Sequence, residues 1–581
     1  MCDRRLIVLK FGGSVLQRSG DVHRSAQEIY RWRRLGYQVV VVVSAIGNAT
    51  DQLSEQVAAF GDDLDDCKVA SLLATGERHS AALLGLALDR AGITAAVCDE
   101  TCAGLLTSGH PLDSQPAGLD RDYLQRQLDH HGVVVLPGFI GRDENGQQAL
   151  LGRGGSDLSA LFIAGQLNAD RCRLLKDVDG LYEFDPKLGS TPVRRFEQIT
   201  WADALLLDES IVQHKGVRFA RDRNICFEVA AMGASDCTCV GESEESCFAE
   251  EVDQPRRLRV ALIGLGTVGW GVYWQLLNQY SDTFELVAVA VRNRTKALAA
   301  GVPESLLTTA RKAVESECDV VVEVVGGVEL PREWVAAALQ QGKHVVTANK
   351  ALLASEGEAL HRLAGRAGVT LAHSAAVGGA VTMLESVAQA SSDGVVSEVA
   401  GILNGSCNFI LDQISQGRTW EDALTLASDR GLTEADPSRD LQGTDAAEKL
   451  VLLARSCGIS LNIADIDSEP LTAEMIRSLP LSAGERLRQI ARMQVHGPHV
   501  TARVAIERVP PESEFAAARG AQNLLQVTGG NGQQTVVRGT GAGRWPTTTA
   551  VLADLLDCCR RQRTRVRVRN GITNVEQPVA G

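Results

Sequence analysis

Three stretches of this 581-residue chain pair residue types with spacings that could support chemistry. In LKFGGS, Lys10 precedes Gly12 and Gly13, whose bare backbone amides together with an ammonium suit phosphate oxygens. A glycine-rich turn with an incidental lysine would look the same. Far along the chain, Asp445 and Lys449 are four residues apart and therefore lie on one face of a helix. An exposed ion pair is the alternative to a catalytic pair there.

The third stretch is a complete GxGxxG pattern formed by Gly264, Gly266 and Gly269. It follows the apolar run LRVALI and leads through Thr267 and Val268 into WGVYWQLL, which is the strand–turn–helix context that a dinucleotide site requires. The helix N-terminus would then face the pyrophosphate. Arg292 follows the next apolar run, where enzymes that use NAD usually carry an acid. Its guanidinium favours the 2′-phosphate of NADP(H), with NAD(H) and a solvated surface arginine as the alternatives.

These residues must be positioned by several folding units, since 581 residues suggest about four at roughly 150 residues each. Apolar runs alternate with amphipathic helices on both sides of an acidic stretch, which is typical of α/β domains. Beyond residue 400, period-two runs such as HVTARVAIERV indicate an α+β domain. We therefore predict an α/β domain over 1–240, a linker over 241–256, a Rossmann domain over 257–395, and an α+β domain over 396–581.

Composition narrows the class of protein. The net charge is -14 with Lys and Arg dispersed, which argues against a nucleic-acid surface. No apolar run is long enough for a membrane span and the first residues lack a signal-peptide layout, so we expect a cytoplasmic protein acting on small molecules. The fourteen cysteines include a CxC pair, Cys237 and Cys239, but no CxxC pair, which predicts reduced and mostly structural thiols.

Four motifs, HVVTANKALLA, GILNGSCNFIL, TEADPSRDLQGTDAAEKL and VRGTGAG, resemble homoserine dehydrogenases in the same order, over about residues 256–570. The resemblance implies NADPH-dependent reduction of aspartate semialdehyde to homoserine. It places Glu434, Asp440 and Asp445 at the amino group and hydroxyl of homoserine, and Lys350 and Lys449 near the reacting carbonyl. One lysine would be the general acid, with a pKa lowered by the neighbouring cation. The further residues that it implies are Asn404 and Ser406 in a substrate-side turn and Gly541 near the cofactor.

Some relatives hold a monovalent cation on backbone carbonyls of the loop written here as HSAAVGGAVTM. The resemblance places that site at Val377 and Gly379. Ser374, Ala380 and Thr382 depart from the family pattern in this loop. The departures concern the cation site and leave the catalytic set intact.

In the first half, VVVSAIGNATDQL, ATGERHSAAL, LLGRGGSDLSALFIA and LLKDVDGLYEFDP follow LKFGGS in order. Together they resemble the amino-acid-kinase fold, and within it aspartate kinase, over about residues 4–240. By this resemblance Lys10, Gly12 and Gly13 contact the phosphates of Mg²⁺-bound ATP, and Asp157 organises Lys10. The remaining roles that it implies are an amino-group contact at Glu77, a carboxylate contact at Arg153, smaller substrate contacts at Ser44, Thr50 and Ser156, and nucleotide contacts at Asp177, Tyr182 and Lys187.

This half also departs from the family. KFGGSVL stands where the family has KFGGTSV, and Lys176 stands where a threonine usually precedes DVDG. Two alternatives therefore stay open: a catalytically silent scaffold, or a kinase for another carboxylate such as glutamate. The two halves leave no room between them for the usual pair of regulatory domains, which predicts weak or absent feedback by threonine or lysine. The family resemblance implies a homodimer or homotetramer.

Overall fold

The computed structural model describes residues 5–184, 193–243, 245–249, 256–433, 436–479, 481–482 and 484–569. The chain divides into two units, Met1–Asp89 with Thr94–Gln254, and Arg90–Ile93 with Pro255–Gly581. The fold classes match the prediction: an α/β first unit, then a Rossmann layer and an α+β layer.

A nine-stranded sheet forms the centre of the first unit, in the order β13-β10-β12-β11-β9-β1-β2-β6-β3. Its inner strands are buried throughout because helices cover both faces, which explains their continuous apolar sequences. The strands are β1 (Leu6–Phe11), β2 (Gln38–Val43), β3 (Ala96–Val97), β6 (Val133–Pro137), β9 (Arg171–Lys176), β10 (Phe196–Thr200), β11 (Phe227–Ala231), β12 (Thr238–Gly241) and β13 (Cys247–Phe248). A smaller sheet contains β4 (Leu106–His110), β5 (Asp113–Gly118), β7 (Ile140–Arg142) and β8 (Gln148–Leu150).

The helices of this unit connect the strands and carry several predicted site residues at their first turns. They are α1 (Val22–Arg34), α2 (Ala49–Ala59), α3 (Asp66–Leu73), α4 (Thr75–Ala91), α5 (Arg121–His131), α6 (Gly155–Leu167), α7 (Trp201–Ala204) and α8 (His214–Asp222).

The predicted linker over 241–256 is wrong in part. Strand β12 continues through Gly241, and Cys247–Phe248 form β13 at the edge of the large sheet. Phe248 stacks on Phe196 of β10, with ring centroids 4.4 Å apart. A two-residue strand is too short to give a periodic signal, so the sequence reads as linker there.

In the second unit, a six-stranded parallel sheet has the order β16-β15-β14-β17-β18-β19. Numbered from β14, this is the 3-2-1-4-5-6 order of a dinucleotide-binding fold. The strands are β14 (Leu258–Ile263), β15 (Phe284–Ala290), β16 (Leu307–Thr308), β17 (Val320–Glu323), β18 (His344–Thr347) and β19 (Leu371–Ala372), and the helices are α9 (Thr267–Asn278), α10 (Arg294–Ala299), α11 (Ala310–Glu315), α12 (Glu329–Gln340) and α13 (Lys350–Ala367).

A second six-stranded sheet, in the order β21-β23-β22-β20-β24-β25, is mostly antiparallel and forms the α+β layer. Its strands are β20 (Val396–Ile402), β21 (Asp467–Ser468), β22 (Arg486–His496), β23 (His499–Val509), β24 (Asn523–Gly529) and β25 (Gln534–Gly539). The accompanying helices are α14 (Met383–Asp393), α15 (Gly405–Ser415), α16 (Trp420–Asp429), α17 (Ser438–Leu441), α18 (Thr444–Ser456), α19 (Ala473–Ser478) and α20 (Glu514–Ala517).

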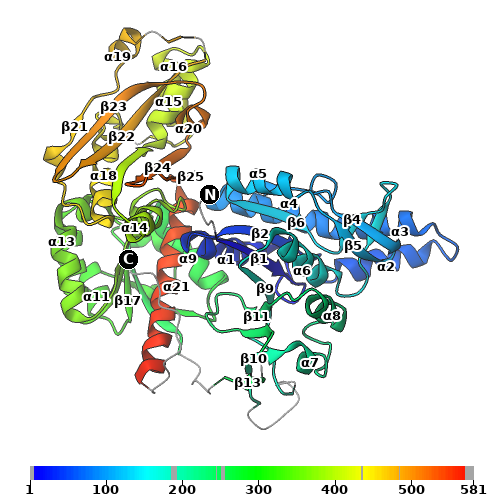
Figure 1. The fold of residues 1–581 in the computed structure, drawn as a ribbon. Helices are drawn as coiled ribbons and strands as arrows, with labels where there is room; N and C mark the ends of the chain where they lie inside the picture. Colours follow the sequence, from blue (N-terminus) through cyan, green and yellow to red (C-terminus); the bar gives the residue numbers. More distant parts are fainter. Residues whose placement is uncertain are drawn as a thin grey trace. The chain divides into compact units, whose positions relative to one another are not determined.

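The last helix, α21 (Arg544–Arg569), lies beside α9 of the Rossmann layer and is drawn in red in Figure 1. The approach is close at Gly271, where an added Cβ would lie 2.2 Å from the Thr548 hydroxyl oxygen. That hydroxyl lies 3.5 Å from the carbonyl oxygen of Val268, so the helix is fixed against the predicted nucleotide loop.

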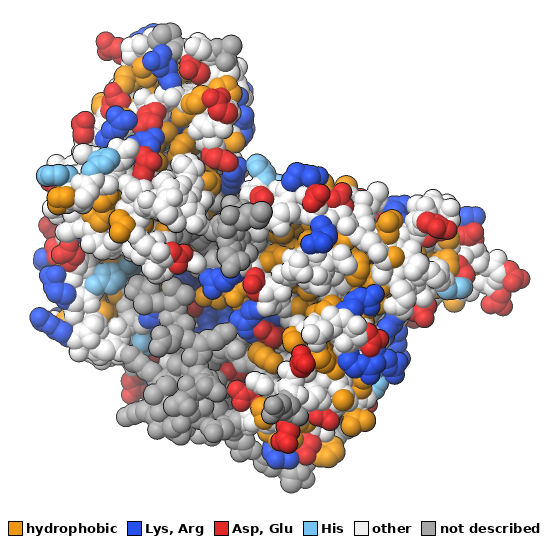
Figure 2. Space-filling view, viewed as in Figure 1, with side chains coloured by type: hydrophobic (Ala, Val, Ile, Leu, Met, Phe, Trp, Pro, Cys, Tyr) orange, Lys and Arg blue, Asp and Glu red, His pale blue; other side chains and the backbone are white. Residues whose placement is uncertain are grey.

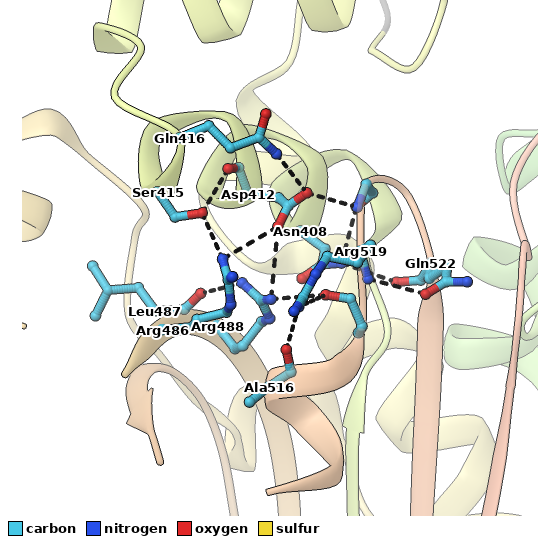
Figure 3. Close-up of polar contacts among 12 residues, drawn as sticks. Asn408, Asp412, Ser415, Gln416, Arg486, Leu487, Arg488, Ala516, Arg519 and Gln522 are labelled. Atoms are coloured by element: carbon cyan, nitrogen blue, oxygen red, sulfur yellow. Dashed lines mark hydrogen bonds and ion pairs between the residues drawn. The ribbon is translucent and has the colours of Figure 1, made fainter. Parts of the chain in front are cut away.

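A buried arginine fixes part of the α+β layer. Arg488 of β22 is fully buried and donates hydrogen bonds to the carbonyl oxygens of Leu487, Phe515 and Ala518. Figure 3 shows Arg488 beside Leu487 and Asp412. Its guanidinium lies 3.9 Å from Asp412 of α15, which also accepts from the Gly520 amide. Phe515, Ala518 and Gly520 all precede β24, so the hydrogen bonds of Arg488 and Asp412 hold the backbone of this segment in place.

All thirteen described cysteines are free thiols. Six are buried, Cys67, Cys237 and Cys457 are half-buried, and Cys102, Cys226, Cys239 and Cys247 are exposed. Among the described residues, no helix is both long and apolar enough to cross a membrane. On the face drawn in Figure 2, Lys and Arg side chains are interspersed with Asp and Glu.

Candidate active sites

The predicted phosphate lysine lies at the centre of a charged cluster in the first unit. Lys10 of β1 contacts Asp157 at 2.6 Å, and Lys176 at the end of β9 contacts the same carboxylate at 2.9 Å. Strands β1 and β9 are parallel neighbours, and Asp157 lies in the first turn of α6. The fold thus joins one carboxylate to two ammonium groups that are far apart in the sequence.

Burial controls the charges of this cluster. Burial alone would raise the pKa of Asp157, but the Lys10 and Lys176 charges lower it to about 2. Burial lowers the pKa of Lys10 to about 8, with the Lys176 charge adding to the effect and Asp157 opposing it. At neutral pH the cluster therefore carries one excess positive charge, which can attract a phosphate.

The glycine turn and Glu77 lie next to this cluster. An added Cβ at Gly12 would lie 3.1 Å from the Lys10 ammonium nitrogen, so a side chain there would press against it. Glu77 is 3 % exposed and accepts a hydrogen bond from the Ala45 amide at 3.3 Å. Its other carboxylate oxygen has no hydrogen-bond partner in the described part of the chain. Burial raises the pKa of Glu77 to about 7, and the hydrogen bond from the Ala45 amide and the Lys10 charge oppose this effect.

Several of the other predicted kinase residues lie at strand ends and helix starts of the first unit. Ser44 follows β2, where its amide donates to the Phe11 carbonyl, and Thr50 lies in the first turn of α2. Ser156 is buried at the start of α6, while Arg153 is exposed just before it. A Cβ added at Gly13 would lie within 4 Å of the carbonyl oxygens of Ala45 and Gly47. Asp177 is exposed, and the Tyr182 hydroxyl donates to Asp179 at 2.6 Å.

Lys187 lies outside the described residues. Burial raises the pKa of Tyr182, and the hydrogen bond to Asp179 adds to the effect. Lys176 is the residue that sequence reasoning missed. In the sequence Lys176 is only a departure from the family's threonine, and the signal that could have found it is its place at the end of a strand that pairs in parallel with β1.

The second unit contains a similar cluster. Asp445 contacts Lys350 at 2.6 Å and Lys449 at 2.8 Å. Lys449 also donates to the Leu403 carbonyl at 2.7 Å. Asp445 is 4 % exposed and lies in the first turn of α18, where the helix N-terminus stabilises a carboxylate.

Lys350 owes its position to the residue before it. Asn349 caps α13 by accepting from the Leu352 amide at 3.1 Å, and its side-chain nitrogen donates to the Gly327 carbonyl. Lys350 is therefore the first residue of the helix, and the capped helix end fixes the backbone from which its side chain contacts Asp445. On the other side, Gly443 precedes α18 with φ +79, a left-handed conformation that favours glycine.

Asn404 links the carboxylates of the site. Its side-chain nitrogen donates to Asp440 at 2.7 Å and to Asp445 at 2.9 Å, and its oxygen caps α15 through the Cys407 amide. Ser406 donates to the Leu432 carbonyl at 2.5 Å. Burial raises the pKa of Asp440, and the Asp445 charge adds to the effect. Glu434 lies outside the described residues.

The expected lowering of a lysine pKa is wrong for Lys350. Burial alone would lower the pKa of Lys350, but the contact with Asp445 outweighs burial and raises it. The pKa of Asp445 is lowered: burial opposes this, and the charges of Lys449 and Lys350 overcome it. The shared carboxylate keeps the ammonium group protonated, an effect that the lysine–lysine spacing could not indicate.

The glycine fingerprint forms a tight turn. Gly264 has φ +103, and an added Cβ at Gly269 would lie 2.1 Å from the Gly264 carbonyl oxygen. Gly266 caps α9, with Thr267 and Val268 in its first turn, and a Cβ built on Gly266 meets nothing within 4 Å. Arg292 is exposed just beyond β15. These residues fit a dinucleotide, because the open side of the turn leaves room for a pyrophosphate at a helix N-terminus.

Gly541 lies against the loop proposed for a monovalent cation. Its amide donates to the Asn523 side chain at 3.2 Å, and an added Cβ would lie 2.7 Å from the Gly378 carbonyl oxygen. Val377 and Gly379 flank Gly378 in this turn. No group of three or more His, Cys, Asp or Glu side chains in the described residues could hold a metal ion. A cation on backbone carbonyls here stays a prediction.

Family comparison decides the identity of the second unit. Residues 264–374 match the model of the homoserine dehydrogenase NAD-binding domain, and residues 383–556 match that of homoserine dehydrogenase. The homoserine dehydrogenase of Bacillus subtilis is 33% identical over 325 residues, covering 54% of this chain and 75% of that protein. This chain belongs to the homoserine dehydrogenase family.

Other homoserine dehydrogenases agree. The enzyme of Corynebacterium glutamicum is 34% identical over 345 residues, covering 55% of this chain and 76% of that protein. The crystal structure of a homoserine dehydrogenase from Thiobacillus denitrificans has a TM-score of 0.50 and 35% identity, over 54% of this chain and 76% of that one.

The first unit matches a different family. Residues 5–219 match the amino acid kinase family. The aspartokinase of Helicobacter pylori is 37% identical over 202 residues, covering 35% of this chain and 50% of that protein. The chain thus joins an amino-acid-kinase domain that resembles half of an aspartokinase to a homoserine dehydrogenase.

Proposed function

We propose that this homoserine dehydrogenase is a bifunctional enzyme. Its first unit phosphorylates L-aspartate with Mg²⁺-ATP to 4-phospho-L-aspartate, and its second unit reduces L-aspartate 4-semialdehyde to L-homoserine with NADPH. The observation that carries the kinase activity is the Lys10–Asp157–Lys176 cluster, with the unpaired carboxylate oxygen of Glu77 as a buried acceptor. A silent scaffold would have no reason to keep these charges buried together, because each costs desolvation energy.

Phosphoryl transfer to a carboxylate requires little covalent chemistry. The β-carboxylate of aspartate is already ionised at neutral pH, so its attack on the γ-phosphate needs no general base. Lys10 and Lys176 neutralise the charge that develops on the phosphoryl oxygens, and Asp157 holds both lysines in place. Glu77 binds the ammonium group of aspartate, which returns its pKa toward the ordinary range. Arg153 binds a carboxylate of aspartate with its planar guanidinium.

In the second unit, NADPH supplies the hydride to the aldehyde carbon. The carbonyl oxygen then becomes an alkoxide, which needs a proton and a nearby positive charge. Lys350 and Lys449 are the two donors, and both contact Asp445. Asn404 holds Asp440 beside Asp445 through its two hydrogen bonds, and Asp440 and Asn404 bind the polar groups of homoserine.

The cofactor preference rests on Arg292. Its guanidinium is exposed beyond β15 and can pair with a 2′-phosphate. Arg292→Ala should raise the KM for NADPH about tenfold, since a charge-assisted pair is lost, and leave that for NADH unchanged. Equal KM changes for both cofactors would exclude this role.

The kinase activity is tested by incubating the purified chain with Mg²⁺-ATP, hydroxylamine and either aspartate or glutamate. We expect hydroxamate from aspartate alone, and its loss in Arg153→Ala, an exposed position where folding is not disturbed. Reduction of aspartate semialdehyde serves as the internal control for folding. Hydroxamate from glutamate would indicate another substrate, and no hydroxamate with intact reduction would establish the silent scaffold.

A further inference from the structure

Two thiols of the first unit lie close together outside the proposed catalytic cluster. Cys237 and Cys239 flank Thr238 at the start of β12, and their sulfur atoms are 3.9 Å apart. Residues separated by one position in a strand point to the same face, which explains the approach. Cys239 is exposed and Cys237 is half-buried, so small reagents can reach the pair.

The surroundings of the pair favour a thiolate. Cys239 is paired across the sheet with Glu228, whose carboxylate binds Arg171 and Arg173 at 2.7 Å each. The hydrogen bond between the two sulfur atoms lowers the pKa of Cys239; burial and Glu228 oppose this effect, and the two arginines support it. Because a thiolate is the reactive form of cysteine, Cys239 is the nucleophile and Cys237 the second thiol.

We propose that Cys237 and Cys239 are a redox-active dithiol that a low-molecular-weight disulfide converts into an intramolecular disulfide. The Cys239 thiolate attacks one sulfur of the small disulfide and releases one thiolate, forming a mixed disulfide. Cys237 then loses its proton and attacks the Cys239 sulfur, releasing the second thiolate. The two cysteines lose two electrons, and the small disulfide is reduced to two thiols.

A disulfide between residues two apart closes a very short ring. Such a ring cannot relax to the usual separation and direction of the Cβ atoms without backbone movement, which makes the bond easily reduced. It also constrains the unfolded chain very little, so it adds little stability. These properties suit a reversible modification rather than a structural cross-link.

The backbone between the thiols is tied to the proposed nucleotide loop. The Thr238 hydroxyl accepts from the Leu181 amide at 2.8 Å and donates to the Phe196 carbonyl at 2.6 Å. Arg195 donates to the Cys237 carbonyl at 2.7 Å and lies 3.7 Å from Asp179. Backbone movement at the dithiol therefore displaces the contacts that hold Asp179 to Tyr182. This effect on ATP rests on the proposed kinase function, whereas disulfide formation does not.

Disulfide formation is tested on the full-length protein, reduced and then titrated with glutathione disulfide. After alkylation of the remaining thiols, the tryptic peptide from Asn224 to Arg256 carries four cysteines, at 226, 237, 239 and 247. We expect Cys237 and Cys239 to escape alkylation together, and the mass of this pair to be two hydrogens below that of two free thiols. Cys226 and Cys247, exposed thiols of the same region, should stay alkylated.

Variants separate the steps. Cys237→Ser should accumulate a stable glutathione adduct on Cys239, and the matched controls Cys226→Ser and Cys247→Ser should form the disulfide as the wild type does. Persistent alkylation of both Cys237 and Cys239, or a disulfide that needs Cys226 or Cys247, would overturn the dithiol.

The link to the nucleotide loop has its own measurement. The oxidised protein should show an ATP KM raised about fivefold or more, and dithiothreitol should restore it. The KM should stay constant in Cys237→Ser and Cys239→Ser treated in the same way. An oxidised protein with unchanged ATP KM would overturn the link while the mass measurement still decides the dithiol. A chain without kinase activity would refute the proposed function, and the mass result would again stand by itself.

Discussion

Each unit of this protein holds one buried aspartate between two lysines, yet the two clusters differ in protonation. In the kinase-type unit, Lys10 is nearly buried and its pKa is lowered to about 8. In the dehydrogenase unit, the side chain of Lys350 is 37% exposed and its pKa is raised. The same three charges thus give opposite shifts, because burial dominates in the first cluster and the carboxylate dominates in the second.

The two proposed chemistries use positive charge in different ways. A phosphoryl-transfer site needs fixed positive charge around oxygens that are already anionic, and a buried cluster held by strand ends supplies it. A carbonyl-reducing site must deliver a proton to an alkoxide, and Lys350, in the first turn of α13 with its side chain 37% exposed, can be reprotonated from solvent. The Arg488–Asp412 cluster shows the contrast with a structural role, since there the guanidinium is bound to backbone carbonyls (Figure 3).

Removal of the shared carboxylate should have the largest effect. Asp445→Asn is expected to lower kcat for aspartate semialdehyde reduction about 10³-fold, because both lysines lose the charge that orients them and keeps Lys350 protonated. Hydroxamate formation should be unchanged. Asp157→Asn is the matched control and should show the reverse pattern. Loss of both activities in either variant would contradict the prediction that each cluster serves one activity, and would indicate that the substitution unfolds the chain.

Glu77 offers a stability test of the kinase-type cluster. Its pKa is raised from 4.5 to about 7, so it favours the folded state fully below pH 4.5 and loses that contribution as pH rises through 7. The free energy of unfolding of the first unit should therefore fall, relative to Glu77→Gln, by about 3 kcal/mol across this range. Urea unfolding at a series of pH values measures it. Parallel pH curves for the two proteins would exclude a buried, unpaired Glu77.

Loss of the central kinase lysine should be somewhat less costly. Lys10→Met is expected to lower the kcat of hydroxamate formation about 10²-fold, the usual cost of one group that stabilises transition-state charge. Lys176 and the glycine-turn amides would remain. The steady-state rate with aspartate measures it, with aspartate semialdehyde reduction as the folding control. A change in the KM for ATP alone would show that Lys10 binds the ground state only.

The smallest effect should come from Lys176, which distinguishes the two clusters. Its charge lowers the pKa of Lys10, so Lys176→Met should raise that pKa. The wild-type kinase activity should decline above pH 8 as Lys10 loses its proton, and in the variant this decline should begin at higher pH. We expect about a tenfold loss of kcat/KM at pH 7. If the decline of activity at alkaline pH begins at the same pH in the variant, Lys176 does not control the pKa of Lys10.

Much of the architecture could be predicted from local patterns. The strands of the large sheet and of the Rossmann sheet were recognisable because they are buried on both faces and therefore continuously apolar. The glycine turn at Gly264 was recognisable because few sequences allow its positive φ and the close approach at Gly269. Strand β13 was not, since two residues carry no period.

The sequence by itself determined the order of the units, the glycine turn and the four-residue spacing of Asp445 and Lys449, because these depend on residue type and short spacing. Resemblance to the two families predicted the roles of Lys10, Asp157 and Lys350. Only the tertiary structure decided that Lys176 joins Asp157, that Asn404 links Asp440 to Asp445, and that the pKa of Lys350 rises while that of Lys10 falls. Protonation depends on the balance between burial and the charges that the fold brings within a few ångströms. That balance is a property of distances in space, which spacing along the chain does not contain.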